Sequence, residues 1–371
     1  MANLLPAYLH SRMGADSGYI GGLFSLLYVA LAAGGILAGW LSDRFQLRKL
    51  MCVLSAALEI VTGLGLIYAR SLEMLSIALI LSWFLAGMHI ALVNVLVGLQ
   101  AEENKRGQVF GTLGFVMGIG PILSGFLYGP ILDAYGMQAL FVIGLVVSTL
   151  WTVISLFYKD VPRLAKAAPK AERSRAPLGW TFALLFGASI LVWFIINGGR
   201  LAISILMNDQ GYSAGSISTT AGVASLAALA MPLLVGWLSD RTGRKPLILG
   251  INLLGLASLA ILSQAQSLAS FWAASALLSL YAAFSGLTTA LVTDLVPPQA
   301  LGLGLSLITN ASNIAGIASS VVLGLAFSSL GPGTTFLAGL ALPAAAALLV
   351  VLVKEPRRKV GKQPGLAAAE L

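Results

Sequence analysis

The sequence predicts an all-α membrane protein built from two related halves. Hydrophobic residues make up 58% of the 371-residue chain and charged residues only 10%, whereas a soluble domain carries about 25% charged residues. Such a chain cannot cover itself with polar surface, so lipid must be its solvent. The hexapeptide GWLSDR at residues 39–44 also returns unchanged at residues 236–241, 197 positions later, which indicates two copies of one module.

Apolar segments long enough to cross a bilayer follow one another along the chain. A transmembrane helix needs about 20 predominantly apolar residues. The segments are uniformly apolar rather than alternating, which excludes a transmembrane β-barrel. We therefore expect eleven complete spans, at residues 18–41, 50–69, 74–100, 107–130, 137–158, 179–206, 216–238, 247–265, 268–293, 302–327 and 334–353.

The repeat accounts for the odd number of spans. In the second copy a full span, residues 179–206, precedes Gly211, whereas only a short segment lies between Met1 and the matching Gly14. We therefore expect that this chain lacks most of its first membrane helix and that the complete protein has twelve helices. A genuine eleven-helix protein is the alternative, and a stop codon directly upstream of Met1 would favour it.

The basic residues predict an orientation and a domain organisation. Nineteen of the 22 Lys and Arg residues fall within residues 44–49, 105–106, 159–175, 241–245 and 354–362. The positive-inside rule places these segments in the cytoplasm, so we expect a multi-pass protein of the cell (inner) membrane with a cytoplasmic C-terminus. The predicted units are an N-terminal half at 1–158, a basic cytoplasmic linker at 159–178, a C-terminal half at 179–353 and a cytoplasmic tail at 354–371.

Several function classes lack the residues that they need. The single cysteine, Cys52, excludes an intrachain disulfide and a Cys-cluster metal site. The sequence has no nucleophile-elbow motif, no paired His at metal-ligand spacing and no phosphate-binding Gly-Lys-Ser/Thr loop. Its basic residues lie in short loops rather than in patches interleaved with aromatic residues. We therefore predict no enzyme activity, cofactor, metal, nucleic acid or ATP, and energy from an ion gradient.

The chain resembles the major facilitator superfamily in three features. These are two six-helix halves in a parallel repeat, a basic linker between them, and a Gly-x-Leu-x-Asp-Arg loop after the second helix of each half. The resemblance covers essentially the whole chain. It implies the fold of that superfamily, with two pseudo-symmetric halves that rock around a central site near the membrane midplane. It also implies secondary active transport of a small molecule by alternating access, in a bilayer-embedded protein that we expect to be a monomer.

The doubled loop motif resembles the superfamily pattern Gly-x-Leu-x-Asp-Arg-x-Gly-Arg-Lys/Arg. The second copy follows it closely, and the first copy departs from it because Gln46 takes the position of the second Gly. A carboxylate near a helix N-terminus gains about 0.3–1 kcal/mol. We expect Asp43 to contact the helix starting near Gly302, and Asp240 to contact the helix starting at Gly107. Both contacts would favour the outward-open state. The alternative is that each Asp pairs locally with the neighbouring arginine. The motif residues are Gly39, Asp43, Arg44 and Arg48 in the first copy, and Gly236, Asp240, Arg241, Gly243, Arg244 and Lys245 in the second.

A Gly-rich stretch on the fifth helix resembles the Gly-Pro-x-x-Gly-Gly motif of proton-coupled exporters, with Ser124 in place of one Gly. Its residues are Gly111, Gly118, Gly120, Pro121 and Gly125. Small residues let helices pack closely in any membrane protein, which is the alternative interpretation. On the fourth helix, Trp83 stands where the superfamily often has an Arg, so a proton mechanism that rests on that Arg is not carried over.

Polar residues inside predicted spans are candidates for function. Glu59 is the first candidate for proton coupling, and a neutral structural Glu is the alternative. Arg200 either extends to the outer membrane surface or faces the cavity and binds an anion. Other candidates for proton or substrate contact, which would otherwise join helices by hydrogen bonds, are Asn197, Tyr281, Asn310 and Asn313, and more weakly His89 and Asn94.

The sequence thus predicts a secondary transporter, with proton-coupled efflux of a small organic compound as the leading interpretation. Uptake of an anionic metabolite anchored by Arg200 is the alternative within transport. A non-transporting membrane sensor or scaffold is the alternative of another class.

Overall fold

The computed structural model describes residues 3–45, 47–100, 106–159, 178–229, 231–296 and 300–353. All regular secondary structure in these ranges is α-helical, which confirms the predicted fold class. The N-terminal half comprises α1 (Leu5–Met13), α2 (Ser17–Phe45), α3 (Arg48–Tyr68), α4 (Leu72–Gln100), α5 (Arg106–Tyr135) and α6 (Met137–Leu156). The C-terminal half comprises α7 (Gly179–Asp209), α8 (Ala214–Leu229), α9 (Met231–Thr242), α10 (Arg244–Leu262), α11 (Leu268–Tyr281), α12 (Phe284–Leu295), α13 (Leu301–Leu330), α14 (Pro332–Gly339) and α15 (Ala341–Leu352).

The helices coincide with the expected membrane spans. Within the described ranges, nine segments are long and apolar enough to cross a membrane. One of them joins α11 to α12 and another joins α14 to α15. The two remaining expected spans correspond to α5 and to α8 followed by α9, and the expected boundaries differ from the observed ones by a few residues.

The repeat is visible in the backbone as well as in the sequence. Gly14, which ends α1, has a φ of 66°, and Gly211, 197 positions later and just after α7, has a φ of 79°. Only glycine adopts this left-handed conformation without a steric penalty. The first module therefore repeats the backbone turn of the second, and α1 corresponds to the last turns of α7.

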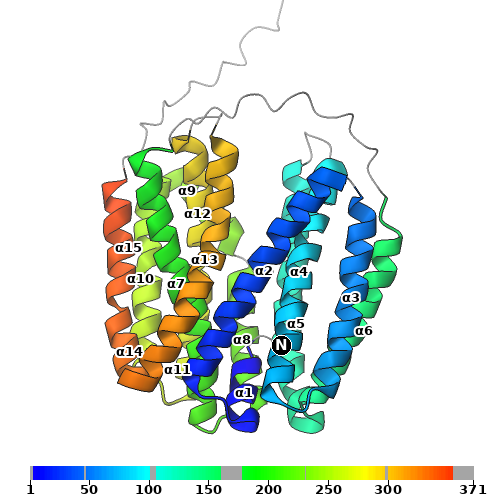
Figure 1. Cartoon of the computed structure of the whole chain (residues 1–371). Helices are drawn as coiled ribbons and strands as arrows, with labels where there is room; N and C mark the ends of the chain where they lie inside the picture. Colours follow the sequence, from blue (N-terminus) through cyan, green and yellow to red (C-terminus); the bar gives the residue numbers. More distant parts are fainter. Residues whose placement is uncertain are drawn as a thin grey trace, which may run out of the picture.

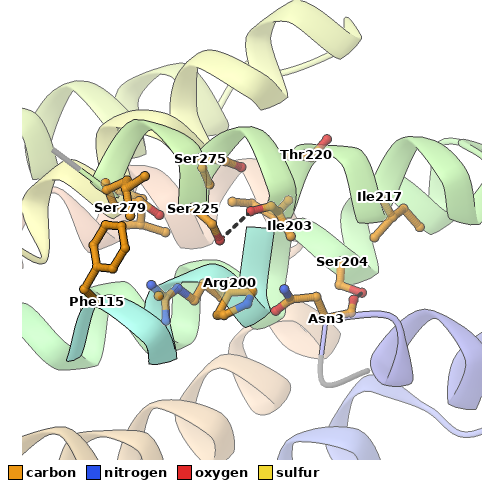
Figure 2. A pocket seen from close by; sticks show the side chains of 17 residues that line it. Asn3, Phe115, Arg200, Ile203, Ser204, Ile217, Thr220, Ser225, Ser275 and Ser279 are labelled. Atoms are coloured by element: carbon orange, nitrogen blue, oxygen red, sulfur yellow. Dashed lines mark hydrogen bonds between the residues drawn. The ribbon is translucent and has the colours of Figure 1, made fainter. Parts of the chain in front are cut away.

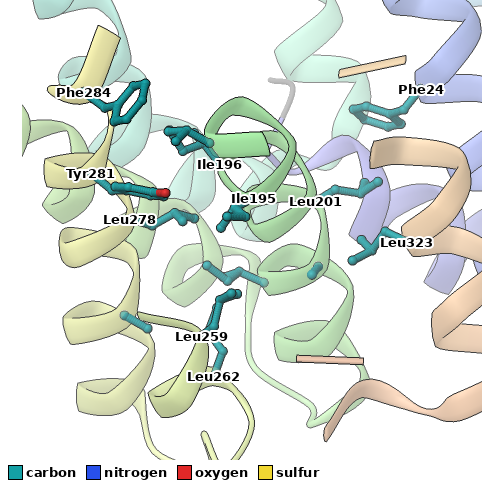
Figure 3. Close-up of a cluster of buried hydrophobic side chains, with 14 of the residues drawn as sticks. Phe24, Ile195, Ile196, Leu201, Leu259, Leu262, Leu278, Tyr281, Phe284 and Leu323 are labelled. Carbon is teal, nitrogen blue, oxygen red and sulfur yellow. The ribbon is translucent and has the colours of Figure 1, made fainter. Parts of the chain in front are cut away.

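The two halves lie side by side and separate toward one end of the bundle (Figure 1). We call this end the linker end, because α6 ends there at Leu156 and α7 begins there at Gly179. The halves pack against each other mainly through α2 with α13, α5 with α8, and α1 with α7. A large buried hydrophobic cluster extends from the C-terminal half across to α2 (Figure 3).

Glycines bring the helices of the two halves into backbone contact. A Cβ on Gly125 of α5 would collide with the Cα of Gly222 on α8, and a Cβ on Gly21 of α2 would collide with the Ser320 carbonyl on α13. Small residues allow this kind of close approach between membrane helices, where dispersion contacts replace the hydrophobic effect as the source of stability. These contacts lie toward the end opposite the linker end, which is why the halves diverge at the linker end.

Candidate functional site

A cavity of about 800 Å³ lies between the two halves. The N-terminal half contributes α5 to its wall through Phe115, Gly118 and Pro121. The C-terminal half contributes α7, α8 and α11, and much of that wall carries hydroxyl groups. A change in the angle between the halves would therefore change the shape of this cavity, which we call the Arg200 cavity. Its polar lining residues are Asn3, Arg200, Ser204, Thr220, Ser225, Ser275 and Ser279.

Arg200 supplies the charge of this cavity. It is the one charged side chain among the described residues that line the cavity, so no acid there balances it. The side chain is exposed although it lies nine residues before the end of α7, about 14 Å by helix rise. The exposed surface therefore faces the cavity, where the view in Figure 2 shows the guanidinium between Phe115 and Asn3.

Three hydroxyl groups of the cavity, those of Ser204, Thr220 and Ser225, donate to backbone carbonyls. Ser204 donates a hydrogen bond of 2.6 Å to the carbonyl of Asn3. Thr220 and Ser225 donate to the carbonyls one turn earlier in α8, at 2.8 and 2.9 Å. Because a hydroxyl oxygen that donates still has lone pairs to accept, these groups are weak partners for an anion and good partners for donors. Arg200 is therefore the group that decides the charge preference of the cavity.

A second cavity of about 470 Å³ lies between α2 and α4 on one side and α13 on the other. Three carboxamide side chains line it, those of Asn94, Asn310 and Asn313. Asn310 donates to the Ser306 carbonyl at 2.9 Å, and Asn313 makes a long contact of 3.4 Å with Asn310. The structure thus brings together three of the sequence-predicted candidates, from both halves, around one space.

Asn197 and Tyr281 lie elsewhere. Asn197 is buried and donates a hydrogen bond of 3.0 Å to the Ser312 carbonyl, which joins α7 to α13. Tyr281 is fully buried inside the C-terminal half (Figure 3) and donates from its hydroxyl to Asn252 Oδ1 at 2.8 Å. Among the described lining residues of the two cavities, neither side chain appears. Both residues therefore join helices in this conformation, and their expected contact with substrate or proton remains a prediction.

Glu59 and His89 are also away from the two cavities, in the interior of the N-terminal half. Glu59 on α3 is 6% exposed, and its Oε2 lies 3.5 Å from the Ser148 hydroxyl on α6. His89 on α4 is 2% exposed, and its Nδ1 lies 3.2 Å from the Ser55 hydroxyl on α3. The structure places both on the three-helix interface of α3, α4 and α6.

The repeated hexapeptide makes the same contact in both halves. Arg44 lies over the Trp40 ring, with 5.5 Å from the guanidinium carbon to the ring centroid, and Arg241 lies over the Trp237 ring at 4.0 Å. Trp and Arg four residues apart share one helix face, and each cation–π contact is worth roughly 0.5–1 kcal/mol at an exposed site. The side chains of Asp43 and Asp240 and the surroundings of Gly236 lie outside the described part of the structure, so the expected carboxylate contacts remain predictions. Gly39 faces open space.

The basic residues after the hexapeptide bind backbone carbonyls and a hydroxyl. Arg48 donates from Nε to Ser42 Oγ at 3.0 Å and is buried. Gly243 has a φ of 87° at the start of α10, Arg244 donates to the Ala290 carbonyl of α12, and Lys245 donates to the carbonyls of Val351 and Val353 at 2.7 and 2.8 Å. Gln46, which replaces this glycine in the first copy, lies outside the described residues.

The fifth-helix motif contributes to both packing and the Arg200 cavity. Gly118 and Pro121 line the cavity, while Gly125 contacts α8. A Cβ on Gly120 would meet open space. Gly111 belongs to α5, but its surroundings lie outside the described residues.

The comparison with known families decides the identity of the fold. The sequence model of a family described as the Major Facilitator Superfamily matches residues 1–199 and 184–370, nearly the whole chain in two overlapping parts. The chain belongs to the major facilitator superfamily. It is therefore a membrane transporter of the secondary type, as its two-fold repeat and cavity between halves predict. The sensor or scaffold alternative is set aside on this finding.

Relatives within the superfamily carry names that point to different roles. The uncharacterized transporter YhjX of Escherichia coli is 25% identical over 277 residues, 69% of this chain and 66% of that protein. The probable nitrate/nitrite transporter NarK2 of Mycobacterium tuberculosis is 25% identical over 335 residues, 86% of this chain and 82% of that protein. The multidrug resistance protein MdtL of Escherichia coli is 24% identical over 227 residues, 59% of this chain and 58% of that protein.

Solved structures of the superfamily share the fold. The nucleoside transporter NupG superposes with a TM-score of 0.71 at 17% identity, over 95% of this chain and 94% of that one. A D-xylose–proton symporter gives a TM-score of 0.71 at 18% identity, over 93% and 89%. A peptide transporter gives 0.76 at 15% identity, over 95% and 90%.

Sequence reasoning missed several residues that the cavity uses. Phe115, Ser275 and Ser279 line the Arg200 cavity, and none was a candidate. Ser275 and Ser279 lie four positions apart on α11, so their shared face was readable from spacing. Which neighbour that face meets was not readable, because spacing along a helix carries no information about the helix packed against it.

Proposed function

We propose that the chain transports a small anion by alternating access, with Arg200 as the group that binds the anionic end of the substrate. The observation that carries the proposal is the unbalanced guanidinium in a cavity between the halves. Charged side chains within membrane spans are rare, and those that occur face the bundle interior or a cavity and mark substrate or ion pathways.

The chemistry of the guanidinium supports an anion. It presents several N–H donors in one plane, which match the two oxygens of a carboxylate or of nitrate. The other described lining residues are uncharged, being apolar, hydroxyl-bearing or, at Asn3, a carboxamide, so a second charge of either sign would be unpaired there. A small monoanion therefore suits the cavity better than a cation or a polyanion.

The position of the cavity supports alternating access. Both halves line it, and their close contacts lie toward the end opposite the linker end. With the basic loops on the cytoplasmic side, this conformation opens toward the cytoplasm. Rocking about the glycine contacts would close that side and open the other.

Ligand-dependent thermal unfolding of the full chain tests the proposal even though the substrate is unidentified. The probes are nitrate, a monocarboxylate, a dicarboxylate, a sugar, a nucleoside and a lipophilic cation. A ligand at one hundred times its Kd stabilises the folded state by about 2.7 kcal/mol. We expect a monoanion to raise the Tm, Arg200→Gln to abolish the rise, and Arg70→Gln to retain it, since Arg70 is exposed between α3 and α4.

Two outcomes would overturn the proposal. One is stabilisation only by neutral or cationic probes, and the other is an unchanged response to the anion in Arg200→Gln. A confirmed ligand would then be followed by counterflow in proteoliposomes, where unlabelled anion inside drives uptake of labelled anion. Counterflow requires alternating access and no ion gradient.

Proton-coupled efflux of a small amphipathic compound is the second candidate. It is favoured by the apolar part of the cavity wall, which includes Phe115, Ile203 and Leu278, and by the names of MdtL and the PmrA homologue of Lactococcus lactis, the latter 26% identical over 264 residues. Inverted vesicles with an acidic interior test it. Collapse of the pH gradient by a lipophilic cation but not by an anion would move this candidate to the front.

A further inference from the structure

The buried face of α3 is polar along its length. Five of its buried residues recur at intervals of four, three, four and three, the spacing of one helix face. Apolar residues cover such a face in most membrane helices, since lipid and neighbouring helices offer few polar partners. The polar face of α3 consists of Arg48, Cys52, Ser55, Glu59 and Thr62.

Glu59 is the acid on this face, and it has almost no partner. Its Oε1 is buried without a hydrogen bond, and its Oε2 has only the 3.5 Å contact with Ser148. No salt bridge to Glu59 occurs among the described residues. Burial of an ionised carboxylate without a cation costs many times more than burial of a neutral carboxyl group. The form that this site can hold is therefore the protonated one.

The titratable groups on the helices around α3 do not change this conclusion. On α4, Glu73 is exposed near the start of the helix and His89 faces α3. On α2, Tyr19 bonds Ser76, Tyr28 packs against Trp83, and Arg44 lies over Trp40. Beyond the end of α6, Tyr158 packs against the cluster around Cys52. On α3 itself, Arg48 bonds Ser42 through Nε and has its Nη1 buried without a hydrogen bond to the described residues, about 16 Å from Glu59 by helix rise.

His89 provides a second unpaired proton acceptor in the same interface. The Ser55 hydroxyl donates to the Cys52 carbonyl at 3.0 Å, so it accepts from His89 Nδ1–H, and this bond fixes the tautomer. The lone pair of Nε2 then has no partner. The ring stacks on Trp151 of α6 with centroids 4.9 Å apart.

The two unpaired atoms belong to neighbouring turns. Ser55 and Glu59 lie one turn apart on α3, and Ser148 and Trp151 lie one turn apart on α6. Buried polar atoms without partners are rare in native structures and call for an explanation. Two of them in one interface, one on a carboxyl group and one on an imidazole, are explained if the interface exchanges a proton.

We propose that Glu59 is a proton-binding site inside the N-terminal half, separate from the Arg200 cavity, and that its protonation sets the balance between the two conformations of the transporter. The proposal adds a coupling ion to the proposed function and rests on it only for alternating access. Helix α4 provides the link, because it turns His89 toward α3 and Ile90, Ala91 and Asn94 toward the cavity between the halves. Loss of the proton leaves an ionised carboxylate that this packing cannot hold.

The sign of the coupling follows from the conformation described here. Glu59 is buried while the halves are apart at the linker end, so protonation stabilises this state and acid raises its population. When pH rises, Glu59 ionises and the equilibrium shifts to a conformation that hydrates it. One coupled proton changes the ratio of the two states by up to about tenfold per pH unit.

Double electron–electron resonance, which measures the distance between two spin labels, tests this coupling on the full chain in nanodiscs without any substrate. Cys52 is replaced by Ala, and spin labels are placed at Leu47→Cys and Leu303→Cys, both exposed at the linker end of opposite halves. We expect the long-distance population to grow on acidification from about pH 9 to about pH 5. Glu59→Gln should remove the response and keep the long distance, while Glu73→Gln, the matched exposed acid, should keep the response.

Infrared difference spectroscopy gives an independent readout of the proton itself. The carbonyl stretch of a protonated carboxyl group should appear on acidification, persist in Ser148→Ala and vanish in Glu59→Gln. A distance distribution that ignores pH, a response that survives Glu59→Gln, or a carboxyl band unaffected by Glu59→Gln would each overturn the proposal. Thermal unfolding of Glu59→Gln with the anion separates this proposal from that of anion binding at Arg200. We expect the variant to keep anion binding, because Glu59 lies outside the Arg200 cavity.

Discussion

Asp133 near the end of α5 accepts a hydrogen bond from the backbone N–H of Gly215 in the first turn of α8, with 2.8 Å between Oδ2 and the nitrogen. The two residues belong to different halves and lie at the end opposite the linker end. A carboxylate at a helix N-terminus satisfies an otherwise unpaired N–H and interacts favourably with the helix dipole. Asp133 therefore fastens the halves together in the conformation described here, and the bond must break when that end opens.

Removing this bond should shift the conformational equilibrium. Loss of an N-terminal cap typically costs about 1 kcal/mol, which corresponds to a roughly fivefold change in the ratio of two states. We expect Asp133→Ala to reduce the population with a separated linker end by that factor, measured with the spin labels at positions 47 and 303.

The control is Asp16→Ala. Asp16 caps α2 through the N–H of Tyr19 at 2.6 Å, within one half. It should lower helix stability and leave the conformational ratio unchanged. Equal shifts from both variants would mean that Asp133 does not act between the halves.

The glycine contact between α5 and α8 should tolerate no side chain. Gly125→Ala places a methyl group against the backbone of Gly222, and overpacking of this kind costs typically 1–3 kcal/mol. We expect a lower Tm and slower transport. Gly120→Ala on the same helix faces open space and should be neutral or stabilising, since Ala is the better helix former. A Tm loss of similar size in both variants would contradict the contact.

Lys245 should hold the end of α15. Its ammonium group donates to the carbonyls of Val351 and Val353, and hydrogen bonds to charged groups contribute about 1.5–3 kcal/mol. We expect Lys245→Met to speed hydrogen exchange in residues 346–353. Lys49→Met, at the start of α3 in the first repeat, should leave this segment protected. Unchanged exchange in Lys245→Met would show that the end of α15 is held by packing alone.

Tyr281 and Asn310 should separate stability from transport. Tyr281→Phe leaves Asn252 Oδ1 buried without its partner, which costs about 1–3 kcal/mol. We therefore expect it to lower the Tm with little change in transport affinity. Asn310→Ala alters a residue that lines the smaller cavity, so we expect little change in Tm and weaker transport. The opposite assignment of the two effects would place the substrate near Tyr281.

The helices could be predicted from the sequence because each depends on its own composition. An apolar stretch of sufficient length must form a helix in lipid, where every backbone group needs a partner within the segment. The expected spans therefore match α2 to α15 closely. The hexapeptide repeat likewise predicted two halves, and its Trp and Arg make the same contact twice.

The partners of the polar residues could not be predicted in this way. Asp133 and Gly215 are 82 positions apart, and nothing in either local pattern points to the other. The sequence placed Tyr281 inside a predicted span, but its side chain bonds Asn252 of α10 and is not among the described lining residues of either cavity. Likewise, the depth of Arg200 along α7 followed from residue number, whereas the exposure of its side chain to a cavity depended on how α5, α8 and α11 pack around it.

The glycine contact between α2 and α13 lies near one end of α2, so a rotation of α2 about this contact moves its other end much further. From Gly21, where α2 crosses α13, to the end of α2 at Phe45 is about 36 Å by helix rise. A rotation of roughly 10° about the crossing would therefore carry the far tip through about 6 Å with the helix remaining straight. A force applied at the linker end therefore exerts a larger torque about the helix crossing than an equal force applied beside the glycines. An antibody or a lipid headgroup bound at the linker end would accordingly shift the conformational equilibrium more than one bound near the crossing.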